Sequence, residues 1–564
     1  MSSVLSRVLQ GGSYRFVQRL LTFTVNSIVL RKLHLNVTGA ATVRLELALA
    51  SIFVLRGGFR LAFLRIPSLD AQGTDKEKMC VQQFVNVAWL STAFSCFMAG
   101  LVLVSSTLAP VNEQEVVMGY PTVLAMYTGA AIIEALAEPM YVLAHASVLV
   151  SWQVAAQSAA FLVRAAVQYV GVVLLELHLV AYGLAELSYA VTLLIMFGFF
   201  FWRKVVDAST TEFFALTNMT QLLPGKPEGE QPWFEPELMT LLFPLTVQSS
   251  VKYLLAEGDK WVLTGFASLE HMGVYGIVSH LGSLVPRMVF LPIEEATKTI
   301  FSKNVALARK RQGKDDMNKE DRNSLAASQT LLLVLLKVLN LVGLVFLCFG
   351  TSYAHTLVVV LYGAEKARQG VGTALAFYCI YIPFLGLNGV CEAVVHAIGN
   401  EHELMRLNKL LGVFFAIYLL SALVFLHVFD WGTMGLILAN CVNMSCRILY
   451  SLTFLASYFG HVQLPHRHLS NRFMNGLALW YHSRPHPLVL TAFILSLLVT
   501  TTSQRVLLHS EMEDTGSLVP HLVHLTVGTL CLAATVATLY RREQPLLQAQ
   551  FATLRDQSQH SHVD

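Results

Sequence analysis

The stretch VRLELALASIFVLRGGFRLAFLR, residues 43–65, decides the class of fold. Most of its side chains are large and apolar, and it is long enough to cross the roughly 30 Å hydrocarbon core of a bilayer as a helix. Four charged residues nevertheless lie inside it: Arg44, Glu46, Arg56 and Arg60. It therefore predicts a membrane-spanning helix with charges at membrane depth, which are costly unless they meet a partner or a polar cavity.

The composition extends this interpretation to the whole chain. Of the 564 residues, 55% are hydrophobic and only 13% are charged, against about 25% charged residues in an ordinary soluble protein. That excludes a soluble globular protein, which needs a charged surface, and it excludes disordered and collagen-like chains. Long apolar segments without short alternation predict helices rather than the strands of a barrel.

We expect an all-α polytopic membrane protein with fourteen spanning helices. The segments are 14–33, 40–63, 84–109, 122–148, 152–175, 180–202, 238–267, 273–300, 327–350, 371–397, 404–428, 432–458, 487–508 and 518–540. The stretch 353–362 is too short to cross a bilayer and predicts a half-helix, lumenal or re-entrant.

Basic residues outside the segments are distributed unevenly between the two sides. Loops on the side of the N-terminus hold most of them, whereas the opposite loops hold only Arg31, Lys32, Lys366, Arg368 and Arg505. Because positively charged loops stay in the cytosol, both termini of this multi-pass chain are expected to be cytosolic.

Two long connections, 203–237 and 301–326, interrupt the segments, and six segments precede the first of them. Six segments before it and six after it are the layout of a duplicated transporter core. The expected parts are an N-terminal six-helix lobe (1–202), a cytosolic inter-lobe loop (203–237), a C-terminal six-helix lobe (238–460), a cytosolic His- and Arg-bearing loop (461–486), two additional transmembrane helices (487–540) and a cytosolic tail (541–564).

Polar residues at membrane depth gather on a few of the predicted helices. Several share one helix face by their spacing, as Arg56 and Arg60 do. Two prolines, Pro286 and Pro292, are expected to bend or break the helix 273–300. The candidate cavity or ion-coupling residues are Glu134, Glu138, Glu257, Asp259, Glu294, Glu295, Asn388, Glu392, Asn440, Asn443 and Arg447.

Two interpretations of these charges remain open. For any single residue, an ion pair between helices or snorkelling to the surface is the commoner explanation. Taken together, the charged stripes on segments 40–63, 238–267 and 273–300 favour a hydrated central cavity of basic character. Such a cavity suits an anionic headgroup such as a diphosphate, because arginine binds phosphate oxygens bidentately.

Motifs of other protein classes are absent from the sequence. It has no phosphate-binding loop, no HExxH and no GxSxG, and its eight cysteines form no CxxC pair. We therefore expect no enzyme activity, no catalytic residue, no metal site, no cofactor and no nucleic-acid partner.

Six strings together resemble one known family: VRLELALASIFVLRGGFRLAFLR, IIEALAEPMYVLA, KYLLAEGDKWVL, GVYGIVSHLGSLVPRMVFLPIEE, LNGVCEAVVHAIG and GLILANCVNMSCRI. They resemble the Rft-type family, eukaryotic proteins required for translocating Man5GlcNAc2-PP-dolichol across the endoplasmic reticulum membrane. The resemblance covers about residues 10–460 and implies the fold of the MOP exporter superfamily, which includes the lipid II flippase MurJ.

The resemblance also implies a site and a set of partners. The family positions that bind substrate would be Arg19, Arg31, Arg44, Arg56, Arg60, Lys252, Lys260 and Arg287. The family usually places an acid after the second arginine of this helix, whereas here Gly57 and Gly58 follow Arg56. The glycine pair loosens the helix or allows close packing. The implied partners are a dolichol-diphosphate-linked oligosaccharide, membrane lipids and dolichol-pathway glycosyltransferases.

Three functions are compatible with these features. The first is a glycolipid transporter that carries the oligosaccharide lipid from the cytosolic to the lumenal leaflet and so supports N-glycosylation. The second is a non-transporting organiser or lipid-binding chaperone of the same pathway. The third is an ion-coupled antiporter, which would depend on the acids rather than on the arginines.

Overall fold

The computed structural model describes residues 22–64, 81–108, 116–147, 149–206, 218–227, 232–311, 319–463, 472–508 and 519–560. Regular structure within these ranges is helical, which confirms the expected all-α membrane fold. Twelve described helices are long and apolar enough to cross a membrane, or thirteen if one bent pair counts as a span. The expected number of fourteen is not confirmed, since the segment 14–33 is described only from residue 22, with helix over 22–32.

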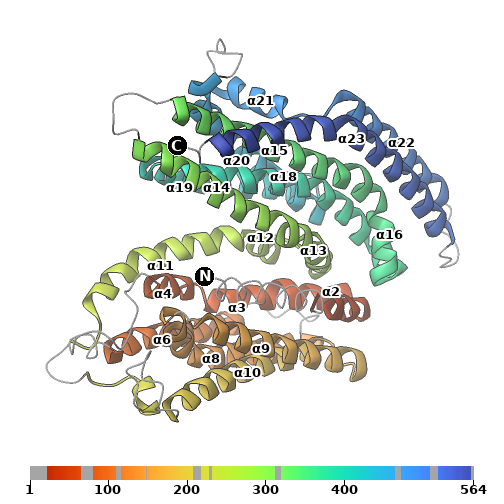
Figure 1. Cartoon of the computed structure of the whole chain (residues 1–564). Coiled ribbons are helices and arrows are strands. Elements are labelled where there is room, and N and C mark those ends of the chain that lie inside the picture. The colour runs from red at the N-terminus through yellow and green to blue at the C-terminus, as the bar shows by residue number, and fades with distance from the viewer. Residues whose placement is uncertain are drawn as a thin grey trace. The chain divides into compact units, whose positions relative to one another are not determined.

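The chain divides into two compact units, Met1–Gly273 and Val274–Asp564, whose elements are labelled in Figure 1. Unit 1 contains α2 (Leu35–Gly39), η1 (Ala40–Leu45), α3 (Glu46–Ile52), α4 (Arg56–Phe63), α6 (Val81–Leu108), α8 (Tyr120–Ala146), α9 (Val150–Tyr169), η2 (Val170–Leu174), α10 (Leu179–Val206), η3 (Met219–Leu222), α11 (Pro236–Ala256) and α12 (Gly258–Phe266). The border between the units falls inside α13 (Leu269–Gly282).

Unit 2 continues from α13 to the C-terminus. It contains η4 (Pro286–Phe290), α14 (Leu291–Arg311), α15 (Lys319–Val345), η5 (Phe346–Gly350), α16 (Thr351–Tyr362), α17 (Ala364–Lys366), η6 (Ala367–Val371), α18 (Gly372–Ile398), α19 (Glu401–Leu423), η7 (Val424–Val428), α20 (Gly432–Gln463), α21 (Arg472–His482), α22 (Pro487–Leu508) and α23 (Val519–His560). The η elements are π-helical turns, apart from the 3-10 turn η3.

In unit 1, α10 packs against α8 and α9, and α6 packs against α8. Figure 1 shows α8, α9 and α10 side by side. Buried Tyr189, Phe197 and Phe201 of α10 form the core of this layer. The helices α11 and α12 lie within unit 1, where α11 contacts α4 and α12 contacts η1. The expected domain borders, including the start of the second lobe at residue 238, stay predictions.

The predicted span 40–63 is a bent pair rather than one straight helix. The helix over Leu35–Ile52 ends at Phe53, and α4 continues from Arg56 at an angle of 49°. Likewise, the predicted span 238–267 is divided at Glu257 between α11 and α12. Both breaks lie beside charged residues, so they determine which way those side chains point.

The pair Gly57-Gly58 lets α11 approach α4 closely. A Cβ atom on Gly57 would lie 2.2 Å from the Ser249 hydroxyl oxygen, and one on Gly58 would lie 2.4 Å from the Thr246 Cα. Small residues at a helix interface allow such backbone contact in membranes. Of the two roles expected for these glycines, close packing is the one that the structure supports.

A methyl group at Gly58 is therefore expected to destabilise unit 1. The substitution Gly58→Ala should lower the free energy of unfolding by about 1–3 kcal/mol, the usual cost of overpacking. Gly100 of α6 has no atom within 4 Å of its would-be Cβ, so Gly100→Ala is the matched control and should be neutral or stabilising. Thermal unfolding in detergent measures both, and equal midpoints for the two variants would contradict the packing argument.

One expectation for unit 2 is wrong, and another is narrowed. The stretch 353–362 is not a separate half-helix, because Ala326–Tyr362 is one helix of 37 residues that contains η5 and α16. Of the bend or break expected from the two prolines, a break is excluded, since Leu269–Lys303 is one helix of 35 residues. The π-helical turn η4 begins at Pro286, so the helix accommodates a residue without an N–H group in a widened turn.

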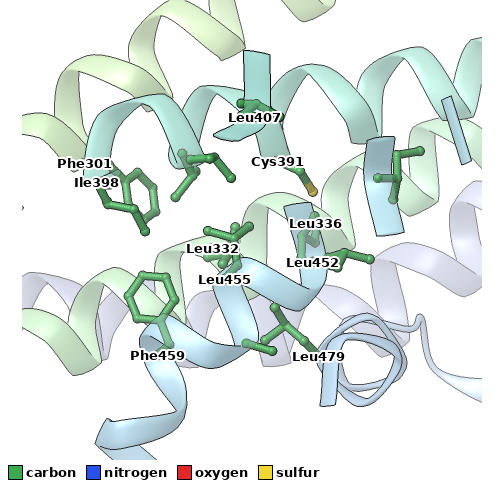
Figure 2. Close-up of a cluster of buried hydrophobic side chains, with 14 residues drawn as sticks. Phe301, Leu332, Leu336, Cys391, Ile398, Leu407, Leu452, Leu455, Phe459 and Leu479 are labelled. Carbon is green, nitrogen blue, oxygen red and sulfur yellow. The ribbon is translucent and has the colours of Figure 1, made fainter. Parts of the chain in front are cut away.

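Figure 2 shows the apolar core that joins six helices of unit 2, α14, α15, α18, α19, α20 and α21. Phe301 of α14, Leu336 of α15, Leu452 of α20 and Leu479 of α21 meet there, each almost completely buried. The helix α21 lies in the connection 461–486, which we expected to be a loop, and Leu479 fixes it to α20.

The C-terminal helices α22 and α23 pack on each other and dock on α15 and α16. At one point, the Lys337 ammonium lies 2.6 Å from the Glu543 carboxylate. At another, the Tyr353 hydroxyl donates to the backbone oxygen of His524 at 2.7 Å, and their rings stack. The two additional helices are thus fixed to unit 2 by polar contacts as well as by apolar packing.

Candidate functional site

The charged residues of the bent pair Leu35–Phe63 meet acids of α8. Arg56 lies 2.5 Å from Glu134, and its Nε lies 3.8 Å from Glu138. Arg60 donates two hydrogen bonds to Glu138, from Nε at 2.7 Å and from Nη2 at 2.8 Å. Spacings of four residues on both helices bring two arginines opposite two glutamates, and the group carries no net charge. We call these four residues the α4–α8 charge cluster.

Aromatic rings cover the guanidinium groups of this cluster. The Arg56 guanidinium carbon lies 4.0 Å from the centre of the Phe53 ring, and that of Arg60 lies 3.8 Å from the centre of the Tyr141 ring. Both arginine side chains are about one-fifth to one-quarter exposed, at 19% and 25%. Each guanidinium group therefore has a carboxylate partner and an aromatic face, so no charge of the cluster is left unpaired inside the bundle.

A second group of charges surrounds Lys260 of α12. Its ammonium lies 2.9 Å from Glu46 of α3 and 3.1 Å from Glu257. Asp259 is partly buried beside it. The contact with Glu46 joins the break between α11 and α12 to the bent pair Leu35–Phe63. The charge of Lys260 is balanced by these two acids.

A third ion pair escaped the sequence-based prediction of the site. Arg164 of α9 lies 3.0 Å from Glu186 of α10, whose side chain is only 2% exposed. Tyr127 and Tyr182 are buried in the same region of unit 1. The predicted segment 180–202 contains a single acid, Glu186, and a membrane arginine on the preceding helix requires such a partner.

Unit 2 has its own polar cluster, between α18 and α20. Arg447 donates a hydrogen bond to Glu392 at 2.5 Å, and the Asn388 amide donates to the same carboxylate at 3.2 Å. The His396 ring lies 3.6 Å from Glu392. Asn440 and Asn443 precede Arg447 on α20, one buried and one partly buried. The predicted stripes of these two helices thus face one another.

The other basic residues predicted to bind substrate differ in exposure and in whether an acid neutralises their charge. Arg31 is exposed on the helix 22–32, Arg44 is partly buried in η1, and Arg19 lies outside the described residues. Lys252 of α11 and Arg287 of η4 are exposed, and neither has an ion pair with any residue that the structure describes. Of the eight predicted basic residues, these two are therefore the ones best able to receive an anion.

The acids Glu294 and Glu295 of α14 are partly buried and exposed, respectively. Within the described part of the chain, no three or more His, Cys, Asp or Glu side chains are grouped as metal ligands would be. The site is thus a set of balanced ion pairs inside each unit, with a few charged side chains left over.

The fold is that of a polytopic helical membrane protein, and two solved structures share it. The structure resembles the lipid II flippase MurJ in an inward closed conformation, with a TM-score of 0.55 and 14% identity over 94% of this chain and 99% of that one. It also resembles an inward-facing multidrug resistance MATE family transporter of the MOP superfamily, with a TM-score of 0.56 and 12% identity over 79% and 95% of the two chains.

The chain belongs to the Rft protein family, whose model matches residues 13–552. The Man(5)GlcNAc(2)-PP-dolichol translocation protein RFT1 of Dictyostelium discoideum is 28% identical over 565 residues, or 96% of each chain. The protein of the same name from Mus musculus is 31% identical over 541 residues, covering 94% of this chain and 92% of its own. The resemblance seen in the sequence is confirmed, and it extends past residue 460 into the C-terminal helices.

Proposed function

We propose that this chain translocates a dolichol-diphosphate-linked oligosaccharide, Man5GlcNAc2-PP-dolichol, from the cytosolic to the lumenal leaflet of the endoplasmic reticulum membrane. The observation that carries the proposal is full-length similarity to relatives named for that translocation. A fold shared with a lipid II flippase supports it. The role is transport without a catalysed reaction, and it would supply the glycan donor for N-glycosylation.

The diphosphate is the part of this substrate that crosses the bilayer at the greatest electrostatic cost. Exposed cations without an acidic partner lower that cost, because charge-assisted hydrogen bonds to phosphate are strong in a medium of low dielectric. Lys252 in unit 1 and Arg287 in unit 2 fulfil this condition. We propose that each contacts the diphosphate during translocation.

The arginines of the α4–α8 charge cluster have a different role in this proposal. Arg56 and Arg60 already bind Glu134 and Glu138, so an anion could approach them only by competing with two carboxylates. Arg56 and Arg60 fix the bent pair Leu35–Phe63 against α8. Replacing either arginine would therefore impair folding more directly than transport. We also propose that both termini lie in the cytosol, which is the side on which the substrate is assembled.

The test is a flip-flop assay in liposomes with purified protein and the native dolichol oligosaccharide. Lys252→Gln and Arg287→Gln should each slow flipping about tenfold, since one charge-assisted hydrogen bond contributes about 1.5–3 kcal/mol and 1.4 kcal/mol is a factor of ten in rate. Arg505→Gln removes an exposed cation in the last turn of α22, and this control should flip at the wild-type rate.

The alternatives predict other outcomes of the same assay. An organiser that only associates with dolichol-pathway glycosyltransferases would leave the flip rate of the liposomes unchanged when the wild-type protein is added. An ion-coupled antiporter would respond to an ion gradient and not to Lys252→Gln. Either result would overturn the proposed function.

A further inference from the structure

Six acids inside the described spans are neutralised by a basic partner. Glu46, Glu134, Glu138, Glu186, Glu392 and Glu543 each lie within 4 Å of a lysine or an arginine. Glu294 and Glu295, inside the span Leu269–Lys303, have no ion pair with any described residue, not even with Lys298 one turn away. Because Glu295 is exposed and Glu294 is partly buried, Glu294 carries the charge that is most costly to keep.

The Glu294 carboxyl group lies directly on the backbone of α18. A Cβ atom on Gly389 would lie only 1.7 Å from its Oε1 atom, so the carboxyl group occupies the space that a side chain at position 389 would fill. The neighbouring Asn388 is 7% exposed, and its Oδ1 atom has no hydrogen-bond donor in the described part of the chain. The glycine of α18 that the Glu294 carboxyl group contacts is therefore next in sequence to a buried acceptor without a described donor.

Among the described buried and partly buried charges around this place, one negative charge is left without a partner. On α18 and α20, Glu392 is balanced by Arg447, with His396 at 3.6 Å. On α15, Lys337 is occupied by Glu543. The same continuous helix holds Glu295, Lys298 and, about two turns before Glu294, Arg287 of η4, and all three are exposed. An uncompensated carboxylate inside a membrane protein costs several kcal/mol, and this cost falls away when the group takes up a proton.

We infer that Glu294 is a proton-binding site of unit 2, where the carboxylate takes a proton from water and releases it again as the surroundings change. Proton uptake brings the charge of the partly buried groups from minus one to zero and converts an acceptor-only group into an O–H donor. The site is independent of the proposed lipid translocation. Only the further step, in which proton uptake drives transport, depends on it.

Infrared difference spectroscopy of the protein in lipid nanodiscs tests this inference. A pH titration of the wild type should show the C=O stretching band of a protonated carboxylic acid, and Glu294→Gln should lose that band. Glu295→Gln changes the adjacent, exposed acid and should keep it. Unchanged spectra in Glu294→Gln would overturn the assignment to this residue.

A second variant keeps the carboxyl group and disturbs only its place. Gly389→Ala puts a methyl group where Oε1 now lies and should shift the titration midpoint of the band toward that of an exposed carboxyl group. Gly386→Ala, one turn earlier on α18, meets the Phe290 ring at 3.0 Å instead and should leave the midpoint in place. Equal midpoints in the two variants would contradict the proposed location.

A metal cation is the competing occupant, and thermal unfolding distinguishes it. If sodium chloride but not choline chloride stabilises the wild type, and the effect disappears in Glu294→Gln without any carboxylic acid band, the site binds sodium and the proton assignment is wrong. The flip-flop assay provides an independent readout. A Glu294→Gln protein that still flips lipid would leave the translocation proposal intact and exclude proton coupling through this residue.

Discussion

Replacing Glu138 with alanine is expected to lower the free energy of unfolding by about 3–5 kcal/mol, the usual cost of breaking a buried ion pair on one side. The Glu138 side chain is 3% exposed and accepts both hydrogen bonds of Arg60. It also lies 3.8 Å from Arg56. Its removal leaves a guanidinium group inside the bundle without a counter-charge, and Glu134 can balance only one arginine.

The measurement is thermal or chemical unfolding in detergent micelles, followed by intrinsic fluorescence. The double variant Arg60→Met with Glu138→Met removes both charges and should recover most of the loss, because the penalty comes from the unpaired charge and not from the absence of the pair. Glu295→Ala, at an exposed acid without a partner, should change stability by no more than about 0.5 kcal/mol. If Glu138→Ala unfolds like this control, the cluster does not stabilise unit 1.

Replacing Lys337 with methionine is expected to have an effect of similar size at the other end of the chain. The Glu543 side chain is completely buried, with 0% exposure, and its partners are the Lys337 ammonium and the backbone N–H of His486. Without the lysine, one hydrogen bond must stabilise a fully buried carboxylate. We expect a loss of about 3–5 kcal/mol and detachment of α22 and α23 from α15.

Hydrogen–deuterium exchange separates detachment from global unfolding. Amides of α22 and α23 should exchange faster in Lys337→Met, while those of the α4–α8 charge cluster should not. Adding Glu543→Gln to Lys337→Met neutralises the buried group and should restore much of the protection. Unaltered exchange in α22 and α23 would show that apolar packing alone fixes the two helices.

The sequence predicts the members of the α4–α8 charge cluster but not the way they pair. Arg56 and Arg60, like Glu134 and Glu138, are four residues apart, so each pair lies on one helix face. The paired residues are 78 positions apart in the chain. The pairing depends on how α4 and α8 pack, and a single sequence does not contain that packing. The ion-pair interpretation was open from the start, and the geometry favours it for these residues.

Two other differences have local causes. Glu186 was overlooked because the segment 180–202 is otherwise apolar, although an arginine on the preceding helix implied an acid somewhere near it. The stretch 353–362 is too short to span a bilayer by itself, which predicts a separate half-helix. In the structure Gly350, Thr351 and Ser352 continue the helix through η5 into α16, because tertiary packing overrides a weak local preference.

The π-helical turn η5 has a consequence for the evolution of this helix. Lys337 and Thr356 are separated by about 5.3 turns of a regular α-helix, which would place them about 100° apart. The additional residue of a π turn absorbs about that angle, so Lys337 and Thr356 can both face α23, where Thr356 contacts His521. A homologue with one residue fewer between Phe346 and Gly350 would keep the same face with a plain α-helix. Single-residue gaps in sequence alignments should therefore accumulate at this turn and be rare on either side of it.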